Sequence, residues 1–235
     1  MGGGKRGRQT IILTIIMIDT STSVITDFEK DARLIYIKNV TSHIPSEQIE
    51  TLYTRVVSKP PRKSSMFGKE YTFPRSMAMF GNSYSFSAQV VEAETENDTV
   101  VEQCIAITNE MFGPGFDSAL VNVYNTGEQY ISQHSDDEHN HTTGSQICTF
   151  SFGVTRDMHI CSKIPTNVIV DKNNKRRRTF ARWKFPLEHG SCAIMDGVEF
   201  QNKYTHGIPK NKKYGENQWR MSITVRNFKK KEDKD

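Results

Sequence analysis

From about residue 119 onward, apolar and polar side chains alternate in short runs that Gly, Pro, Asn and Asp separate. A period of two is typical of β-strands that bury one face. Many short strands at this spacing favour a β-sandwich or jelly roll. The predicted strands cover residues 119–124, 129–134, 146–152, 157–161, 168–170, 178–185, 191–195, 203–207 and 220–228.

The N-terminal half mixes two periods. Residues 33–40 alternate like a strand, whereas apolar residues at helical spacing predict helices over 46–57 and 100–111. Ser46 is the expected N-cap of the first helix, and Gly113-Pro114-Gly115 should end the second. This half therefore contributes helices as well as strands to the fold.

Together these patterns predict a mainly β protein with flanking helices (α+β), built on a double-stranded β-helix, or jelly-roll, core. Its length suits one domain with a hydrophobic core. The aromatic, Gly- and Pro-rich stretch 66–88 predicts a hairpin with loops. We divide the chain into a disordered or loosely attached leader (1–30), a helix and hairpin segment (31–118), the β-helix core (119–228) and a charged tail (229–235).

An apolar run of eight residues, Ile11 to Ile18, lies within the leader. It is far shorter than the roughly 20 residues that span a membrane. A signal peptide is the alternative, because a basic stretch precedes the run, but Asp19 ends it and no clear cleavage site follows. We therefore expect no association with a membrane.

The cysteines also bear on the compartment. The four of them are widely spaced and form no CxxC pair, which is typical of reduced thiols in an intracellular protein. They lie at Cys104, Cys148, Cys161 and Cys192.

Positive charge is clustered, although the formal net charge of +4 is modest. Basic clusters occur at residues 172–178 (KNNKRRR), 210–213 and 229–231. Such clusters suit contacts with phosphates, and solvated loops are the alternative for any single one. The first cluster also fits a nuclear address, so we expect a nuclear location if the source is eukaryotic.

The candidate chemistry begins with His134-Ser135-Asp136. Residues i and i+2 of a strand point to the same face, so His134 and Asp136 could reach one ion together. His206, on a distant predicted strand, would complete a facial triad of two histidines and one carboxylate. Such a triad is typical of Fe(II) oxygenases and leaves iron positions open for a co-substrate and O₂. The histidine–aspartate pair alone is common, so the interpretation depends on its surroundings.

The last predicted strand supplies those surroundings. Its alternation places Arg220, Ser222, Thr224 and Arg226 on one face. Arginines on a buried face are costly unless anions meet them, and their planar fork suits a carboxylate such as that of 2-oxoglutarate. An amphipathic edge strand with a wet face is the alternative. In the same way, Asn122 and Tyr124 share one face of an earlier strand.

The order of these motifs resembles the AlkB family of nucleic-acid dealkylases, from about residue 33 to residue 228. The joint occurrence is specific, although no single motif is. The matching residues are Asn122, Tyr124, Gly127, His134-Ser135-Asp136-Asp137-Glu138, Ser151-Phe152-Gly153, Arg156-Asp157, Leu187, His189-Gly190-Ser191, His206, Pro209, Arg220 and Arg226.

The resemblance implies an Fe(2+)- and 2-oxoglutarate-dependent dioxygenase that uses O₂. It makes His134, Asp136 and His206 the catalytic iron ligands, and both arginines hold carboxylates of the co-substrate. Some relatives have Asn where this chain has Ser222, and the polar group of the shorter serine side chain reaches less far. The implied co-substrate residues are Asn122, Tyr124, Arg220, Ser222, Thr224 and Arg226.

The resemblance also implies repair of 1-methyladenine and 3-methylcytosine in DNA with release of formaldehyde. An enzyme acting on a base within a duplex must extrude that base and stack it on aromatic side chains. Tyr84, Phe86 and Ser87 would form the pocket wall. Glu138 would accept a hydrogen bond from an exocyclic amine, and Asp137 would pair with the last arginine.

Residues 66–81 resemble members of the family that repair double-stranded DNA in animals. Phe67 would fill the gap left by the extruded base, next to Gly68, while Lys69 and Arg75 would contact phosphates. This similarity favours duplex DNA and makes segment 31–118 a nucleotide-recognition layer. Single-stranded DNA or RNA remains an alternative partner for the expected monomer.

Two other functions and one structural alternative stay open. An RNA demethylase can share the fold, and a non-catalytic domain could read modified bases. Ordinary core packing is the alternative role for Tyr84 and Phe86.

Overall fold

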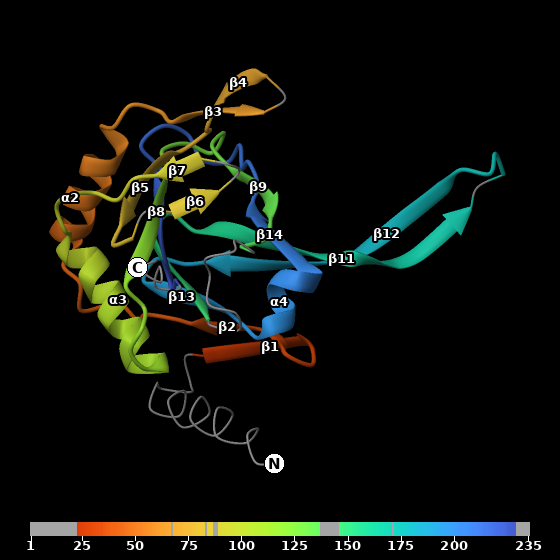
Figure 1. The fold of residues 1–235 in the computed structure, drawn as a ribbon, viewed down its shortest axis with the longest axis horizontal. Coiled ribbons are helices and arrows are strands. Elements are labelled where there is room, and N and C mark those ends of the chain that lie inside the picture. Colours follow the sequence, from red (N-terminus) through yellow and green to blue (C-terminus); the bar gives the residue numbers. More distant parts are fainter. Residues whose placement is uncertain are drawn as a thin grey trace, which may run out of the picture.

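The computed structural model describes residues 23–66, 68–82, 84–86, 89–136, 146–170 and 172–228. Two antiparallel sheets form the body (Figure 1). In order, the major sheet contains β1 (Ser23–Glu29), β2 (Ala32–Ile37), β13 (Ser191–Asp196), β10 (Ile147–Gly153), β15 (Arg220–Arg226), β8 (Ser118–Tyr124) and β5 (Ser76–Phe80). The minor sheet contains β12 (Arg176–Leu187), β11 (Arg156–Val170), β14 (Tyr204–Ile208) and β9 (Ile131–His134). The predicted mainly β fold is confirmed.

Two helices, α2 (Ser46–Val57) and α3 (Thr99–Phe112), cover the outer face of the major sheet (Figure 1). Alternate residues of β8 and β15, such as Val121 and Ile223, pack beneath them in the larger hydrophobic core. The opposite residues of the same strands face the space between the two sheets. The alternation therefore lets one face of β8 and β15 pack in the hydrophobic core, while the other face is available for a functional site.

The start of each helix differs from the expectation. Pro45 occupies the N-cap position of α2 without a side-chain cap, so the prediction of Ser46 as N-cap is wrong and Ser46 is the first helical residue. Proline fixes φ near the helical value but leaves ψ free to enter from an extended conformation. In α3 the side chain of Asp98 accepts a hydrogen bond from the Val100 backbone N–H, a cap that the pattern did not predict.

Strand β1 corrects the expected extent of the leader. Residues 23–29 pair with β2 and form an edge of the major sheet, so they are not loosely attached. The ring of Phe28 contacts Trp183, Phe200 and Tyr204, which explains why the strand is held in place. Val24 and Ile25 are exposed, and this departure from a regular pattern concealed the strand. Residues 1–22 and the tail 229–235 lie outside the described residues.

Shorter elements surround the open end of the two sheets. β3 (Lys63–Met66) and β4 (Lys69–Thr72) form a hairpin, and β6 (Tyr84–Phe86) pairs with β7 (Gln89–Val91). A short helix that the sequence did not predict, α4 (Val198–Lys203), precedes β14. In the described part of the chain, no helix is long and apolar enough to span a bilayer.

The outer parts of β11 and β12 form a two-stranded arm that projects from the body (Figure 1). We define the arm as Ser162 to Arg182, of which residue 171 is not described. The sequence predicted two separate runs, 157–161 and 168–170, where the structure has the single strand β11, because Pro165 interrupts the pattern. Pairing is irregular around Pro165, which has no backbone N–H to donate, but both strands continue past it.

Candidate metal and co-substrate site

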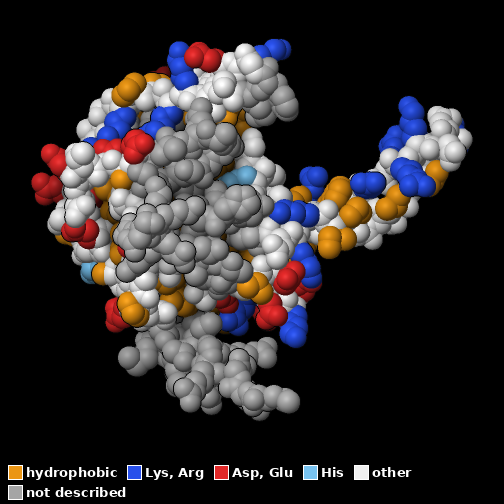
Figure 2. All heavy atoms as spheres, viewed as in Figure 1, with side chains coloured by type: hydrophobic (Ala, Val, Ile, Leu, Met, Phe, Trp, Pro, Cys, Tyr) orange, Lys and Arg blue, Asp and Glu red, His pale blue; other side chains and the backbone are white. Residues whose placement is uncertain are grey.

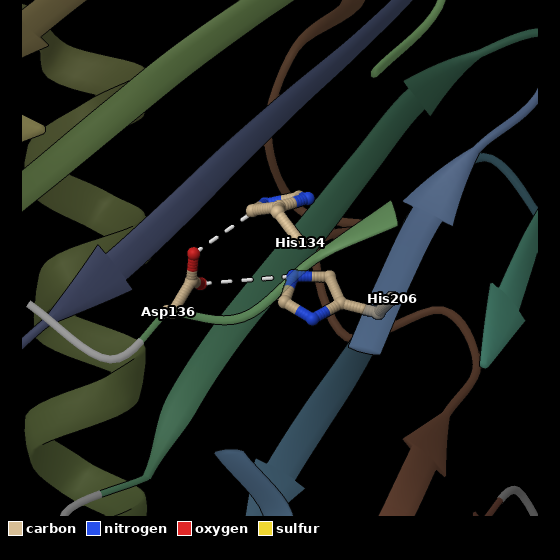
Figure 3. A group of neighbouring side chains, drawn as sticks. All are labelled: His134, Asp136 and His206. Atoms are coloured by element: carbon tan, nitrogen blue, oxygen red, sulfur yellow. Dashed lines mark ion pairs between the residues drawn. The ribbon is translucent and has the colours of Figure 1, made fainter. Parts of the chain in front are cut away.

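The two histidines of the predicted triad are direct cross-strand partners, since His206 of β14 pairs with His134 of β9. Asp136 lies two residues after the end of β9, so it reaches the histidines from the segment that follows the strand and not from the strand itself. One ligand atom from each of the three residues lies within 4.8 Å of the others (Figure 3). Two imidazoles and one carboxylate in this arrangement fit the donor set of a non-haem Fe(II) site.

Hydrogen bonds prepare His134 to bind a metal. Its Nδ1 lies 2.9 Å from the Ser132 carbonyl oxygen, which fixes the proton on Nδ1 and leaves the lone pair of Nε2 free. That Nε2 lies 3.5 Å from Asp136 Oδ1, and His206 Nε2 lies 3.8 Å from Asp136 Oδ2 (Figure 3). Both imidazole nitrogens therefore face the carboxylate, where a shared cation would bind.

The charge states of the triad suit a cation. Burial alone would raise the pKa of Asp136, but the charge of Arg226 and the hydrogen bond with His134 outweigh it and hold this pKa well below its usual range. Burial, together with the neighbouring His134, lowers the pKa of His206 to about 3. Burial also acts against protonation of His134, but the hydrogen bond to Asp136 raises its pKa. At neutral pH the site thus offers a carboxylate and at least one neutral imidazole.

Hydrogen bonds fix the segment after β9 that carries Ser135 and Asp136. The Asp136 backbone N–H donates to Gln201 Oε1 at 2.9 Å, and Ser135 Oγ donates to the Tyr204 carbonyl at 3.0 Å. Gln201 belongs to α4, the helix that the sequence did not predict. Gly207, the residue after His206, lies so close to β9 that an added Cβ would be 2.9 Å from the Ile131 carbonyl oxygen. Helix α4 and Gly207 both help to position the triad, although the sequence predicted neither the helix nor a role for Gly207.

The predicted co-substrate residues line the same cavity as the triad. Strands β8 and β15 pair Asn122 with Ser222 and Tyr124 with Arg220, which puts these side chains on one face. The cavity has a volume of about 740 Å³ and lies between the two sheets. Its wall includes all six predicted positions, namely Asn122, Tyr124, Arg220, Ser222, Thr224 and Arg226. The predicted alternation of the last strand is confirmed.

Arg220 is a buried cation with unused hydrogen-bonding capacity. Its exposed fraction is 1%, and its Nη2 donates to Ser151 Oγ at 3.1 Å. Its Nε and Nη1 have no hydrogen-bond partner among the described residues. Burial lowers the pKa of Arg220 to about 10, so the guanidinium stays charged at neutral pH. A buried charge with open N–H groups is an expected receptor for a carboxylate.

The second arginine of β15 has a different neighbour. Arg226 Nη2 donates to Asp136 Oδ2 at 2.7 Å, within the triad itself. The sequence instead predicted Asp137 as its partner, and Asp137 lies outside the described residues. In the described structure the two arginines thus have separate surroundings, one at the triad and one against Ser151 and Tyr124.

Arg75 lies inside the cavity and not on an outer surface. Only 7% of it is exposed, and its Nε donates to Asn122 Oδ1 at 2.7 Å. The hairpin leads directly into the cavity wall through Phe73 and Pro74. The contact of Arg75 with phosphates stays a prediction. This buried hydrogen bond connects the N-terminal segment to a predicted co-substrate residue.

The other predicted substrate residues are only partly placed. Phe67, Ser87, Asp137 and Glu138 lie outside the described residues. Tyr84 and Phe86 lie on β6, whose backbone alone is described. Gly68, with φ of 74°, and Lys69 lie where the β3–β4 hairpin turns, and Lys69 is exposed.

Sequence reasoning missed several residues around the cavity. Tyr71, Phe73 and Tyr130 line it, although the sequence predicted no role for any of the three. Arg156, part of the AlkB-like motif but without a predicted role, is fully buried and donates to the carbonyls of Gln129 at 3.0 Å and Pro209 at 2.5 Å. It thereby ties together the segments that precede β9 and follow β14.

A comparison with known proteins agrees with this geometry. Residues 32–226 match the family model described as the 2OG-Fe(II) oxygenase superfamily. The chain belongs to this superfamily. A solved structure of OsALKBH1 has the same fold, with a TM-score of 0.50 and 15% identity over 86% of this chain and 100% of that one. The superfamily's name specifies the Fe(II) and 2-oxoglutarate that the triad and Arg220 fit.

Curated relatives confirm the AlkB resemblance. Bovine alpha-ketoglutarate-dependent dioxygenase alkB homolog 3 is 32% identical over 117 residues, covering 50% of this chain and 38% of that protein. Mouse DNA oxidative demethylase ALKBH2 is 35% identical over 105 residues, covering 44% of this chain and 41% of that protein. The matches thus span about two fifths of each relative's own length.

Proposed function

We propose that this oxygenase removes N-methyl groups oxidatively from bases of nucleic acid, with 1-methyladenine and 3-methylcytosine in DNA as its substrates. The observation that carries the proposal is the cavity between the sheets. It combines three converging ligand atoms with a buried guanidinium that has open N–H groups. The names of the relatives, a dioxygenase and a DNA oxidative demethylase, support the same reaction.

His134, Asp136 and His206 would hold Fe(II), and Arg220 would hold the distal carboxylate of 2-oxoglutarate. With these groups bound, the site would use O₂ to oxidise 2-oxoglutarate to succinate and CO₂ and to convert an N-methyl group to a hydroxymethyl group, which would leave as formaldehyde. The residues of the chain bind and orient the reactants and exclude water. Arg226 keeps Asp136 ionised and therefore ready to bind a metal. Asn122, held by Arg75, and Ser222 would complete the polar wall around the co-substrate.

The arm supports a nucleic-acid substrate. From Ser162 to Arg182 the sequence contains seven Lys and Arg residues and one acidic residue. Lys and Arg side chains follow the arm together with hydrophobic ones (Figure 2). The register places Val168 and Val170 opposite Arg178 and Arg176, and both valines are about half exposed. A projecting basic ribbon of this kind suits a phosphate backbone that extends beyond the base in the cavity.

One assay tests the proposed reaction. The purified protein is supplied with Fe(II), 2-oxoglutarate and air, and matched duplex DNA, single-stranded DNA and RNA each carry one methylated base. Formaldehyde release and the loss of a methyl mass from the base are measured. Demethylation that is fastest on DNA is expected. Turnover only on RNA would replace DNA as the substrate, and binding without turnover on every substrate would indicate a module that reads modified bases.

Preference for duplex DNA has its own test. Phe67→Ala is expected to impair repair of duplex more than repair of a single strand, because only a duplex leaves a gap for an apolar wedge to fill. The ratio of the two rates is the measurement. An unchanged ratio would remove the wedge assignment and leave the chemistry untouched.

A further inference from the structure

We propose that Tyr71, Tyr130 and Lys210 form a second nucleotide subsite at the mouth of the cavity. The base next to the methylated one would stack on the two tyrosines, and its phosphate would meet Lys210. This inference rests on the proposed function and adds a specificity-determining element to it.

The two tyrosines line one cavity, although they come from distant parts of the sequence. Tyr71 belongs to β4, and Tyr130 directly precedes β9, the strand that carries His134. Both line the cavity that contains the triad. The Tyr130 backbone N–H donates to the Pro74 carbonyl at 3.3 Å, which fixes the hairpin segment against the start of β9. A nucleotide strand whose methylated base enters the cavity would therefore pass these rings.

The rings are supported without being enclosed. Tyr71 contacts the ring of Phe73 edge to face at 5.3 Å, and Phe73 is in turn covered by the Arg75 guanidinium at 5.4 Å. Tyr71 and Tyr130 are both partly exposed. Their orientation is thus held from behind while surface remains for a ligand, which is the requirement for a stacking platform.

Tyr71 and Tyr130 differ from other tyrosines of the fold in the hydrogen bonding of their hydroxyl groups. Tyr36, Tyr53 and Tyr214 each have a hydroxyl hydrogen bond, with the Glu188 backbone N–H, Asn125 Oδ1 and the Thr155 carbonyl respectively. Neither Tyr71 nor Tyr130 forms a hydroxyl hydrogen bond with another described residue. Packing and hydrogen bonding within the described structure therefore leave both rings available.

Lys210 gives the subsite its charge. Its Nζ lies 5.4 Å from the centre of the Tyr130 ring and 3.1 Å from Glu128 Oε2. Both partners of this ion pair are exposed, so a phosphate can compete for the ammonium group. An aromatic ring beside a mobile cation matches the alternation of base and phosphate along a nucleic-acid strand.

The test compares two substrates of different length. One is a methylated mononucleotide, and the other is a single-stranded trinucleotide with the same lesion in its centre. Wild-type protein is expected to prefer the trinucleotide in kcat/KM. Tyr71→Leu and Tyr130→Leu should each lower this preference about tenfold, because stacking of one base contributes an affinity of that order. Tyr71→Phe keeps the ring and should keep the preference within about twofold.

Lys210→Ala should lower the preference by a few-fold, and the effect should vanish in high salt. Lys38→Ala is the matched control, because Lys38 is also exposed and pairs with a glutamate, Glu188, at 3.2 Å, away from the cavity. Binding of a fluorescent hexathymidylate to the Mn(II)-loaded protein, followed by anisotropy, gives a second readout. The leucine variants should bind it about tenfold more weakly than wild type.

The outcomes separate the two proposals. A wild-type protein that demethylates neither substrate contradicts the proposed function. A wild-type protein that demethylates both without preferring the trinucleotide overturns the subsite alone. Leucine variants with an unchanged preference and unchanged hexathymidylate binding overturn it as well.

Discussion

The interior of the cavity and its outer elements are built in different ways. Inside, the register of β8 with β15 and of β9 with β14 places the candidate ligands, apart from Asp136, which follows β9. These side chains are buried, except that of His134, which is about one-third exposed. Outside, the β3–β4 hairpin and the arm are two-stranded projections with many exposed side chains. If the proposed function holds, the chemistry rests on the buried core, and we expect the choice of substrate to rest on the exposed elements around it.

The sharpest test of this division is removal of a triad ligand. His134→Ala should reduce turnover more than roughly 100-fold on every substrate, since even the loss of a partner outside the ligand sphere costs about 10–100-fold in metal sites. Stabilisation by Mn(II) in thermal unfolding should disappear with it. His159→Ala is the matched control, because His159 lies in the same sheet, on β11, and does not line the cavity. Residual demethylation at a normal rate in His134→Ala would contradict its role as a ligand.

Replacing Arg220 is expected to have two opposite effects, weaker binding of 2-oxoglutarate and higher stability of the protein without it. Arg220→Met should raise the KM for 2-oxoglutarate about 100-fold, because truncating one partner of a buried charge pair costs several kcal/mol. The same change should stabilise the protein without co-substrate, by about 1–2 kcal/mol, since it removes a buried charge with open N–H groups.

Thermal unfolding with Mn(II), with and without 2-oxoglutarate, measures both effects of Arg220→Met. Arg220→Lys keeps the charge and should show a smaller rise in KM. A methionine variant that is still stabilised by 2-oxoglutarate as strongly as wild type would exclude Arg220 as the carboxylate receptor.

Replacing Arg226 tests whether this arginine, which lies beside the triad, supports binding of the metal. Arg226→Gln removes the charge that keeps Asp136 ionised, so metal affinity should fall about 10–100-fold. The KM for 2-oxoglutarate at saturating metal should change less than in Arg220→Met. Metal titration by calorimetry makes the measurement, and Arg226→Lys is the control that keeps a charge. Equal effects of both arginine variants on 2-oxoglutarate would instead support the expectation that both hold its carboxylates.

Sequence patterns were most informative for the interior. Period-two alternation placed Arg220, Ser222, Thr224 and Arg226 on one face, because a strand buried on both sides still has to separate its polar from its apolar residues. The two histidines were also identified, but their direct pairing depends on the register of two strands some 70 residues apart, which no local pattern contains. The hydrogen bond from Arg226 to Asp136 joins the two sheets, because β15 belongs to the major sheet and β9 to the minor one, so it depends on how the sheets pack together.

The outer elements were harder to predict. The arm was divided into fragments because Pro165 resembles a strand end, although a ribbon can continue past a residue that donates no hydrogen bond. Strand β1 was assigned to the leader because its exposed Val24 and Ile25 obscure the alternation. The sequence assigned Arg75 a contact with phosphates but gave no sign of its hydrogen bond to Asn122, which depends on tertiary contact. Exposure at an edge and burial by distant contacts are properties of the whole fold.

The arm provides the smallest and most selective of the expected effects. Replacing Arg176, Arg177 and Arg178 together with alanine should weaken binding of duplex DNA about tenfold near 0.1 M salt, with little dependence on sequence. Each phosphate contact that is lost lowers the slope of log affinity against log salt by about 0.9, so a decrease of about 2–3 is expected if all three arginines bind phosphates. Anisotropy measurements over a range of salt concentrations give this slope. A triple lysine variant is the charge-matched control and should keep it. If the alanine variant keeps the wild-type slope, the arm does not contact the phosphate backbone of the DNA. The proposed selection of the substrate would then depend on the β3–β4 hairpin and the mouth of the cavity alone.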